Sequence, residues 1–415
     1  TDGSTADLDI AYGNLNTADN EADTLTISED LDDNGALVID GGSELTITNA
    51  SGTSPTIDLT DASGDAIQIT SDVNVTIEGV TIQANQDSDV IDASGLTGDS
   101  TLSVVDSTLA VDSSGSNAFG IRTNAANAGE GGTVDVQNVT FEDTINPSDN
   151  EEAGIFAFKA TEVSVTESTF DGLDFGIQTP DVPTVTVQDS SFTALQDEGI
   201  ILNNENDNTY APAVTITGNE FGTIDGGSSA STAVLFLEDT GSGNFDDSNG
   251  IQVTNNNFND SSGFAIATAT GFTLTQGSSS DDRADLGITV SAEDNFYNSD
   301  LGPVVEDGSG TETRSIPTEY ANDGNAAHIV GVNADLRPFR VGPAPDGASV
   351  DFDFDNSITQ SNPDERTVTN VTFAGNVNES SINVFAVNDG TSGNNETLVE
   401  NGEVVADDRT VIQST

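Results

Sequence analysis

A recurring spacing of large apolar residues is the feature that most limits what this chain can fold into. Two apolar residues separated by one position are followed, five residues after the second, by phenylalanine or another large apolar residue. The copies are Val75, Ile77, Ile82; Leu102, Val104, Leu109; Val134, Val136, Phe141; Val163, Val165, Phe170; Val185, Val187, Phe192; Val214, Ile216, Phe221; Ile251, Val253, Phe258; and, with one extra residue, Ile288, Val290, Phe296. Alternation with a period of two residues predicts strands with one buried face.

A second pattern follows most of these copies, namely a small residue and then an aliphatic one. The pairs are Gly154-Ile155, Gly176-Ile177, Gly199-Ile200, Ala233-Val234 and Ala265-Ile266, and Leu45, Ile47, Ile57 and Leu59 look like a degenerate earlier copy. The spacing between copies varies, and the extra length falls in stretches rich in Gly, Asp, Ser and Asn. A constant core with loops of variable length is typical of a solenoid, in which each turn buries its apolar face against the next.

Two segments, VTITGNEF (214–221) and IQVTNNNFNDSSGFAI (251–266), resemble the coils of right-handed parallel β-helix proteins. That superfamily includes pectate lyases, polygalacturonases, phage tailspikes and many surface proteins. The resemblance covers about residues 36–305 and implies a fold rather than an activity. The alternative architecture is an array of antiparallel sandwiches, which would require a hairpin turn about every ten residues.

The chain divides into four predicted segments. Residues 1–35 form an N-terminal extension that caps the first coil or pairs with another chain, and residues 36–305 form the parallel β-helix. Residues 306–347, which include RPFRVGPAPDG, form a linker or cap. Residues 348–415 contain alternating strands such as VDFDFD and INVFAV. The predicted fold class is therefore all-β, a right-handed parallel β-helix followed by a small antiparallel β domain.

The composition is strongly acidic. There are 72 Asp and Glu residues against 8 Lys and Arg residues, which gives a formal net charge of -64. Such a charge repels itself in dilute buffer, whereas molar salt shortens the screening length to about 3 Å. The composition thus predicts a salt-adapted protein, and the regular apolar runs disfavour the alternative of an acidic disordered chain. Binding to nucleic acid is not expected, because it requires clustered Lys and Arg.

Several features favour an extracellular location. No apolar stretch approaches the roughly 20 residues that cross a bilayer, so we expect no membrane insertion. The chain begins at Thr1 without methionine, as a processed secreted protein does, and it has no cysteine for disulfides or thiolate sites. Seven sequons are candidates for glycosylation, although an Asn-, Ser- and Thr-rich chain also makes them by chance: Asn49, Asn74, Asn138, Asn259, Asn370, Asn378 and Asn395.

The sequence offers little material for catalysis. His328 is the sole histidine, and its apolar neighbours favour a packed structural role. Acidic residues are so widespread that no pair stands out for glycoside hydrolysis, and Asp281-Asp282 lacks the other motifs of polygalacturonases. The basic residues within the predicted coils are Arg122, Lys159 and Arg283, and we expect Lys159 to form a structural ion pair. No catalytic residue is therefore assigned, and a role other than an enzyme is favoured.

Calcium is the cofactor that the acidic residues favour. Asp30, Asp32 and Asn34, followed by Gly35, reproduce the first half of a calcium-binding loop, but Gly41 stands where an EF-hand has glutamate. A solvated acidic turn is the alternative. Asp351, Asp353 and Asp355 alternate with apolar residues and share one strand face, which either meets water or binds a cation between protomers.

These observations favour an extracellular structural or adhesive protein of a halophilic organism, as a subunit of a filament, appendage or surface layer. The expected partner is another copy of the chain, in a homo-oligomer or homopolymer, with glycans as further candidates. The alternatives are a carbohydrate-active β-helix enzyme, either a polysaccharide lyase or a glycoside hydrolase, and a viral tail fibre or spike that binds glycans.

Overall fold

The computed structural model describes most of the chain up to Tyr297 and separate strands beyond it. The described residues are 22–32, 35–41, 44–62, 64–112, 117–143, 152–205, 210–222, 224, 233–239, 245–259, 264–269, 288–297, 304–306, 328–330, 333–335, 339–340, 343, 349–354, 368–374, 382–387, 395–400, 403–404 and 411–414. All regular structure in this part of the chain is β-strand. None of it is a helix with the length and apolarity needed to span a bilayer.

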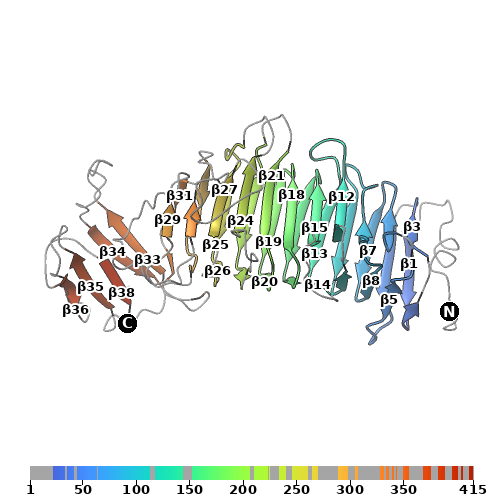
Figure 1. Cartoon of the computed structure of the whole chain (residues 1–415), viewed down its shortest axis with the longest axis horizontal. Helices are drawn as coiled ribbons and strands as arrows, with labels where there is room; N and C mark the ends of the chain where they lie inside the picture. Colours follow the sequence, from blue (N-terminus) through green and yellow to red (C-terminus); the bar gives the residue numbers. More distant parts are fainter. Residues whose placement is uncertain are drawn as a thin grey trace.

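The chain is a right-handed parallel β-helix followed by antiparallel strands, so the predicted fold class is confirmed. Figure 1 shows the coils side by side along the long axis of the molecule. Three parallel sheets, here called A, B and C, run along this axis. Sheet A consists of β1 (Ala22–Ile27), β4 (Glu44–Asn49), β7 (Asn74–Glu78), β10 (Thr101–Val105), β13 (Thr133–Gln137), β16 (Glu162–Thr166), β19 (Thr184–Gln188), β22 (Ala213–Thr217), β25 (Ile251–Thr254), β28 (Thr289–Ser291) and β31 (Asn333–Asp335).

The other two parallel sheets complete each coil. Sheet B consists of β2 (Leu31–Asp32), β5 (Thr56–Leu59), β8 (Thr81–Ala84), β11 (Thr108–Val111), β14 (Thr140–Asp143), β17 (Thr169–Asp171), β20 (Ser191–Thr193), β23 (Glu220–Phe221) and β26 (Asn257–Phe258). Sheet C consists of β3 (Leu37–Ile39), β6 (Ile67–Ile69), β9 (Ile91–Asp92), β12 (Ala118–Asn124), β15 (Glu152–Phe158), β18 (Phe175–Pro180), β21 (Ile200–Asn204), β24 (Ala233–Asp239), β27 (Phe264–Ala269), β30 (His328–Val330) and, beyond it, β29 (Val304–Glu306).

The repeated apolar residues fill the interior in register. Val163 pairs with Val185 and Val165 with Val187 across sheet A, and all four are fully buried. The degenerate copy is confirmed as well, because Leu45 pairs with Val75 in the same sheet. Since like residues stack on like residues, the apolar pattern of one coil continues directly into the next.

The structure corrects two details of the pattern. Tyr297, rather than Phe296, stacks on Phe258, because Val290 pairs with Ile251. The inward pair of this coil is therefore Val290 and Ala292, both buried, and the aromatic residue follows Ala292 by the usual five positions. In sheet C the partner of Ile200 is Leu235, so the pair Ala233-Val234 lies one residue out of the expected register. In both cases the inward positions lie one or two residues further along the chain than expected.

A column of aromatic rings runs through the core along sheet B. Its members are Phe141, Phe170, Phe192, Phe221, Phe258 and Tyr297, with neighbouring ring centroids 4.7 to 5.3 Å apart. The small residues of sheet C make room for these rings. A Cβ added at Gly176 would lie 2.7 Å from a ring carbon of Phe192 and 2.5 Å from the carbonyl oxygen of Gly199. Glycine is therefore required where the sheet passes under a ring.

The corner between sheets A and B is short and regular. Seven consecutive coils, from the β7–β8 corner to the β25–β26 corner, turn here with two residues, of which the first has positive φ. The second points inward and, in the later coils, is polar and hydrogen-bonded to its neighbours. Asn219, Asn256 and Asn295 are buried, and the backbone nitrogen of Asn219 donates to Oδ1 of Asn256 at 3.0 Å. This ladder of asparagine side chains accepts hydrogen bonds from backbone N–H groups that would otherwise be unpaired at the corner.

The parallel ladders reach further at both ends than residues 36–305. β1 and β2, which fall in the expected N-terminal extension, pair with β4 and β5. At the other end, β30 pairs with β27 and β31 with β28. Two antiparallel sheets follow, formed by β32 (Phe339–Arg340), β33 (Ser349–Phe354) and β34 (Val368–Ala374), and by β35 (Ile382–Val387), β36 (Asn395–Glu400), β37 (Glu403–Val404) and β38 (Val411–Ser414).

Candidate functional site

The outer surface of sheet C around β9, β12 and β15 gathers the charged and aromatic residues that most resemble a functional site. Arg122 and Lys159, the two basic residues among the described coils, both lie here. Ile121 and Thr123 are buried on either side of Arg122, so strand alternation directs the arginine side chain outward. Three aspartates from neighbouring coils complete the group.

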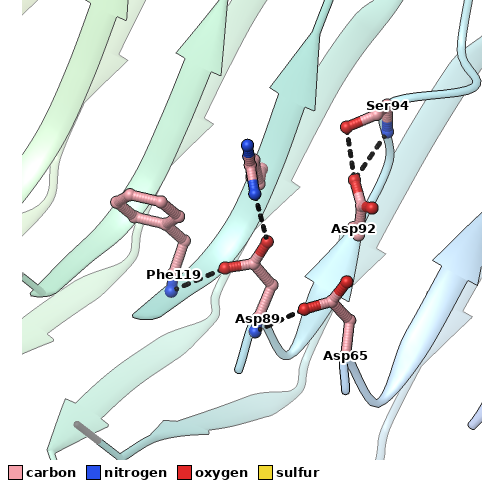
Figure 2. A network of polar contacts seen from close by, with 6 residues as sticks. Asp65, Asp89, Asp92, Ser94 and Phe119 are labelled. Carbon is pink, nitrogen blue, oxygen red and sulfur yellow. Dashed lines mark hydrogen bonds and ion pairs between the residues drawn. The ribbon is translucent and has the colours of Figure 1, made fainter. Parts of the chain in front are cut away.

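Asp89 lies at the centre of this network (Figure 2). Its backbone nitrogen donates to Oδ1 of Asp65 at 3.0 Å, and its own Oδ1 accepts the backbone nitrogen of Phe119 at 3.2 Å. Its Oδ2 lies 3.3 Å from Nη1 of Arg122, whose side chain is 38% exposed whereas that of Asp89 is only 3% exposed. One residue thus connects three successive coils, through its backbone nitrogen on one side and its carboxylate on the other.

Local sequence explains why the aspartates meet. Asp65 and Asp89 each stand two residues before the first inward isoleucine of a sheet C strand, and these isoleucines, Ile67 and Ile91, pair in register. The two carboxyl groups are therefore brought to the same edge of adjacent coils. Asp92, in β9 itself, accepts hydrogen bonds from the backbone nitrogen and the hydroxyl of Ser94 (Figure 2).

The environment shifts the pKa of Asp89 strongly. Burial and then the nearby carboxylate of Asp65 raise this pKa from 3.8 to about 7, although the Arg122 guanidinium opposes the shift. A carboxyl that titrates near neutrality has the proton affinity of a general acid or base. Here, however, the carboxylate is nearly inaccessible and accepts hydrogen bonds from protein donors. The geometry therefore supports a proton-sensitive link between coils better than an attack on a substrate.

Aromatic rings extend the site along β12 and β15. The ring centroids of Phe119 and Phe156 are 4.9 Å apart, and those of Phe156 and Phe158 are 6.2 Å apart. The guanidinium carbon of Arg122 lies 5.9 Å from the Phe119 centroid, and Nζ of Lys159 lies 4.5 Å from the Phe158 centroid. Such cation–π contacts hold Arg122 beside the buried ring of Phe119 and Lys159 beside the half-buried ring of Phe158.

The predicted ion pair of Lys159 is replaced by other contacts. Its Nζ donates to the carbonyl oxygen of Ala126 at 3.2 Å and lies over the Phe158 ring. Within the described residues, the ion pair closer than 4 Å is instead that of Arg122 with Asp89. Lys159 adopts positive φ just after β15, so its side chain leaves the strand at a corner rather than from the sheet face.

Of the predicted calcium residues, the structure describes the side chains of Asp30 and Asp32 alone. Asp30 and Asp32 are exposed, and Oδ1 of Asp30 accepts the backbone nitrogen of Thr56 at 2.9 Å. Asn34 and Asp355 lie outside the described residues, whereas Asp351 and Asp353 belong to β33, whose backbone alone is described. No three His, Asp or Glu side chains among the described residues are arranged to hold a metal ion.

A second acidic group lies just after β11, a strand of sheet B. The carboxyl of Asp112 is largely buried, and its Oδ1 makes no hydrogen bond. Burial, followed by the charges of Asp143 and Asp87, raises the pKa of Asp112. Two or three neighbouring carboxylates repel one another, and this repulsion by itself does not define a site.

The sequons differ in how their amide groups are used. Asn74 is exposed and its Oδ1 accepts the backbone nitrogen of Thr101 at 2.9 Å. The Nδ2 atoms of Asn49, Asn138 and Asn259 donate to Thr53, Asp106 and Glu220 respectively. Asn378 lies outside the described residues, and only the backbone of Asn370 and Asn395 is described.

Sequence reasoning missed the Asp89 network. The signal was present as two similar segments, Asp65-Ala66-Ile67 and Asp89-Val90-Ile91, one coil apart. In a chain with 72 acidic residues, two such aspartates do not stand out until the register places them together. Comparison with known proteins adds no further assignment: no family model, no curated protein and no solved structure matches this chain.

Proposed function

We propose that this protein is an extracellular structural or adhesive protein of a salt-adapted organism, a subunit of a filament, appendage or surface layer. The observation that carries the proposal is the continuous rod of parallel coils, in which two sheets have 11 strands each. Membership of the parallel β-helix superfamily, in its salt-adapted surface type, is part of the same proposal. A long, stiff, acidic body suits a load-bearing or space-filling role.

The ends of the rod support assembly. The first coil leaves one edge of β1 outside any ladder among the described strands, and β38 likewise lies at the edge of its sheet. An edge strand offers unpaired backbone groups to a further strand. Subunits that exchange strands at these edges would form a polymer without needing complementary charge.

Electron microscopy of the native material at the salt concentration of the source is the decisive experiment. We expect polymers or a layer whose repeating unit is the rod, with a terminal segment docked on a neighbouring subunit. A monomeric protein that depolymerises acidic polysaccharide in high salt, and that loses this activity when one or two carboxylates are changed, would contradict the proposal.

Glycan binding is the second candidate function, and the aromatic platform of sheet C favours it. Phe156 and Phe158 are half-buried, and Arg122 and Lys159 lie beside them. Titration calorimetry with acidic oligosaccharides at high salt tests this function. We expect Phe156→Ala to abolish binding and Gln178→Ala, a change at the paired position on β18, to preserve it. Equal binding by both variants would exclude this surface.

Glycosylation is part of the proposed extracellular role. We expect glycosylation at Asn74, because it is exposed and its amide is held by Oδ1. Peptide mass spectrometry of the native protein tests this, and an unmodified Asn74 would contradict it.

We also propose that calcium bridges protomers through Asp351, Asp353 and Asp355, so a chelator should shorten the polymers and added calcium should restore them.

A further inference from the structure

Four consecutive strands of sheet A carry no charge on their outer face. In β19, β22, β25 and β28, every outward position carries Thr, Ser, Gln or Ala. These side chains are half-buried or exposed, so they reach the surface. We call this surface the hydroxyl face. Its central row is formed by Thr186, Thr215, Gln252 and Ser291, which are paired from strand to strand.

The rest of the same sheet differs in charge. At the N-terminal end, Glu44, Glu78 and Asp135 point outward from β4, β7 and β13. Acidic residues also border the hydroxyl face, with Glu162 on β16 and Asp189 at the corner after β19. In a chain with a net charge of -64, a run of four strands without an outward charge is the exception.

This charge distribution determines what can dock there. Two copies of an acidic protein repel each other, and burying carboxylates between them carries a large desolvation cost. An uncharged face avoids both penalties. Hydroxyl and amide groups act as both donors and acceptors, so such a face is complementary to a copy of itself. Thr217 and Thr254 already bond each other through their hydroxyls across two strands, at 3.3 Å.

We propose that the hydroxyl face is a lateral contact between two copies of this chain, related by a two-fold axis. Such an isologous contact places the same strands of both rods against each other. This lateral contact rests on the proposed function, because it adds a side-by-side contact between subunits to their end-to-end contact. The acidic border then forms the polar rim of the interface.

The size of the face sets the strength of the contact. Four strands spaced about 4.8 Å apart cover on the order of 300 Å² per copy, well below the roughly 800 Å² of a stable interface. The isolated contact is therefore weak and depends on concentration, and repetition along a polymer strengthens it. Because salt screens the repulsion between the acidic surfaces, the association strengthens as salt concentration rises.

Sedimentation equilibrium of the full chain at about 3 M salt tests the contact. The test variant is Thr186→Asp with Thr215→Asp, two paired outward positions inside the hydroxyl face. The control is Thr46→Asp with Thr76→Asp, an equally paired change on the acidic part of the same sheet. We expect the test variant to associate at least about tenfold more weakly than the unaltered chain, and the control to associate within about twofold of it.

Circular dichroism must show the same fold for both variants, so that loss of association is not loss of structure. Equal association of the test variant and the control would overturn the lateral contact. A neutral glycan bound to the hydroxyl face in the native material would overturn it too. If polymers form while the hydroxyl face stays in solvent, the lateral contact fails and the proposed function stands. If no polymer or layer exists in the native material, the proposed function fails as well.

Discussion

A single buried carboxyl, that of Asp89, links proton concentration to the cohesion of the rod. Its pKa of about 7 lies well above the 3.8 of an ordinary aspartate, mainly because of burial. The folded protein therefore binds a proton at Asp89 between these pH values, whereas the unfolded chain does not. The contribution to stability is fully present below pH 3.8 and is lost as the pH rises through 7.

The change Asp89→Asn tests this link at the residue scale. It removes the titrating group but keeps an oxygen that can accept the Phe119 nitrogen. At pH 8 and constant molar salt, the variant should be more stable than the unaltered chain, with an upper limit of roughly 4 kcal/mol set by the pKa shift. At pH 4 this advantage should largely disappear. Chemical denaturation at both pH values measures it.

A matched control for this experiment is Asp92→Asn in the neighbouring strand. It keeps Asp89 intact and removes only the smallest of the effects that raise its pKa, so it should retain most of the pH dependence of the unaltered chain. If Asp89→Asn retained that dependence as well, the buried carboxyl would not be the group that titrates.

Gly176 is a residue where a single added methyl group should be costly. An alanine Cβ would meet the Phe192 ring at 2.7 Å and the Gly199 carbonyl oxygen at 2.5 Å, and neither neighbour is free to move. Gly176→Ala should lower the free energy of unfolding by about 1–3 kcal/mol, the usual cost of overpacking. Gly41→Ala is the control, because nothing lies within 4 Å of its added Cβ. Equal melting temperatures for the two variants would contradict the packing described for the aromatic column.

The corner between sheets A and B is the element on which coil stacking depends. Asn256 donates to the carbonyl oxygen of Ile216 at 2.9 Å and to Oδ1 of Asn295 at 3.1 Å. It also accepts the backbone nitrogen of Asn219 at 3.0 Å. Each of these groups is buried, so removal of one side chain leaves several polar atoms unsatisfied.

Asn256→Ala should therefore destabilise the protein by about 3 kcal/mol, more than the loss of one ordinary hydrogen bond. The adjacent change Asn255→Gly is the control. Asn255 has a φ of 59°, a conformation that glycine adopts without strain, so stability should change by less than about 1 kcal/mol. Denaturant titration of both variants decides the matter, and a smaller loss for Asn256→Ala than for Asn255→Gly would refute the ladder's role.

The elements differ in how well sequence could predict them. Val185, Val187 and Phe192 predicted their strands because an inward side chain repeats every second residue. Tyr297 was not predicted because Ile288, Val290 and Ala292 alternate as a longer buried run, and only the pairing of Val290 with Ile251 shows which two occupy the repeat positions. The network around Asp89 was not predicted because its partners come from other coils, and only the three-dimensional register brings them together.

The whole molecule is governed by its charge of -64. We expect unfolding or loosening below about 0.5 M salt, because repulsion between surface carboxylates is then poorly screened. Circular dichroism during stepwise dialysis measures this. A neutral osmolyte at matched osmolarity is the control and should not protect the fold as salt does. An unchanged spectrum down to low salt would show that the apolar core alone withstands the repulsion.

The corners also differ along the whole rod. The sheet A to sheet B corner keeps two residues through seven coils, whereas the connection from sheet B to sheet C ranges from residues 172–174 to residues 222–232. The length of the connections therefore varies on one edge of the rod and is constant on another. A peptide displayed on this scaffold should be grafted between β23 and β24. The two-residue corner between sheets A and B should be left unchanged, because it keeps successive coils aligned.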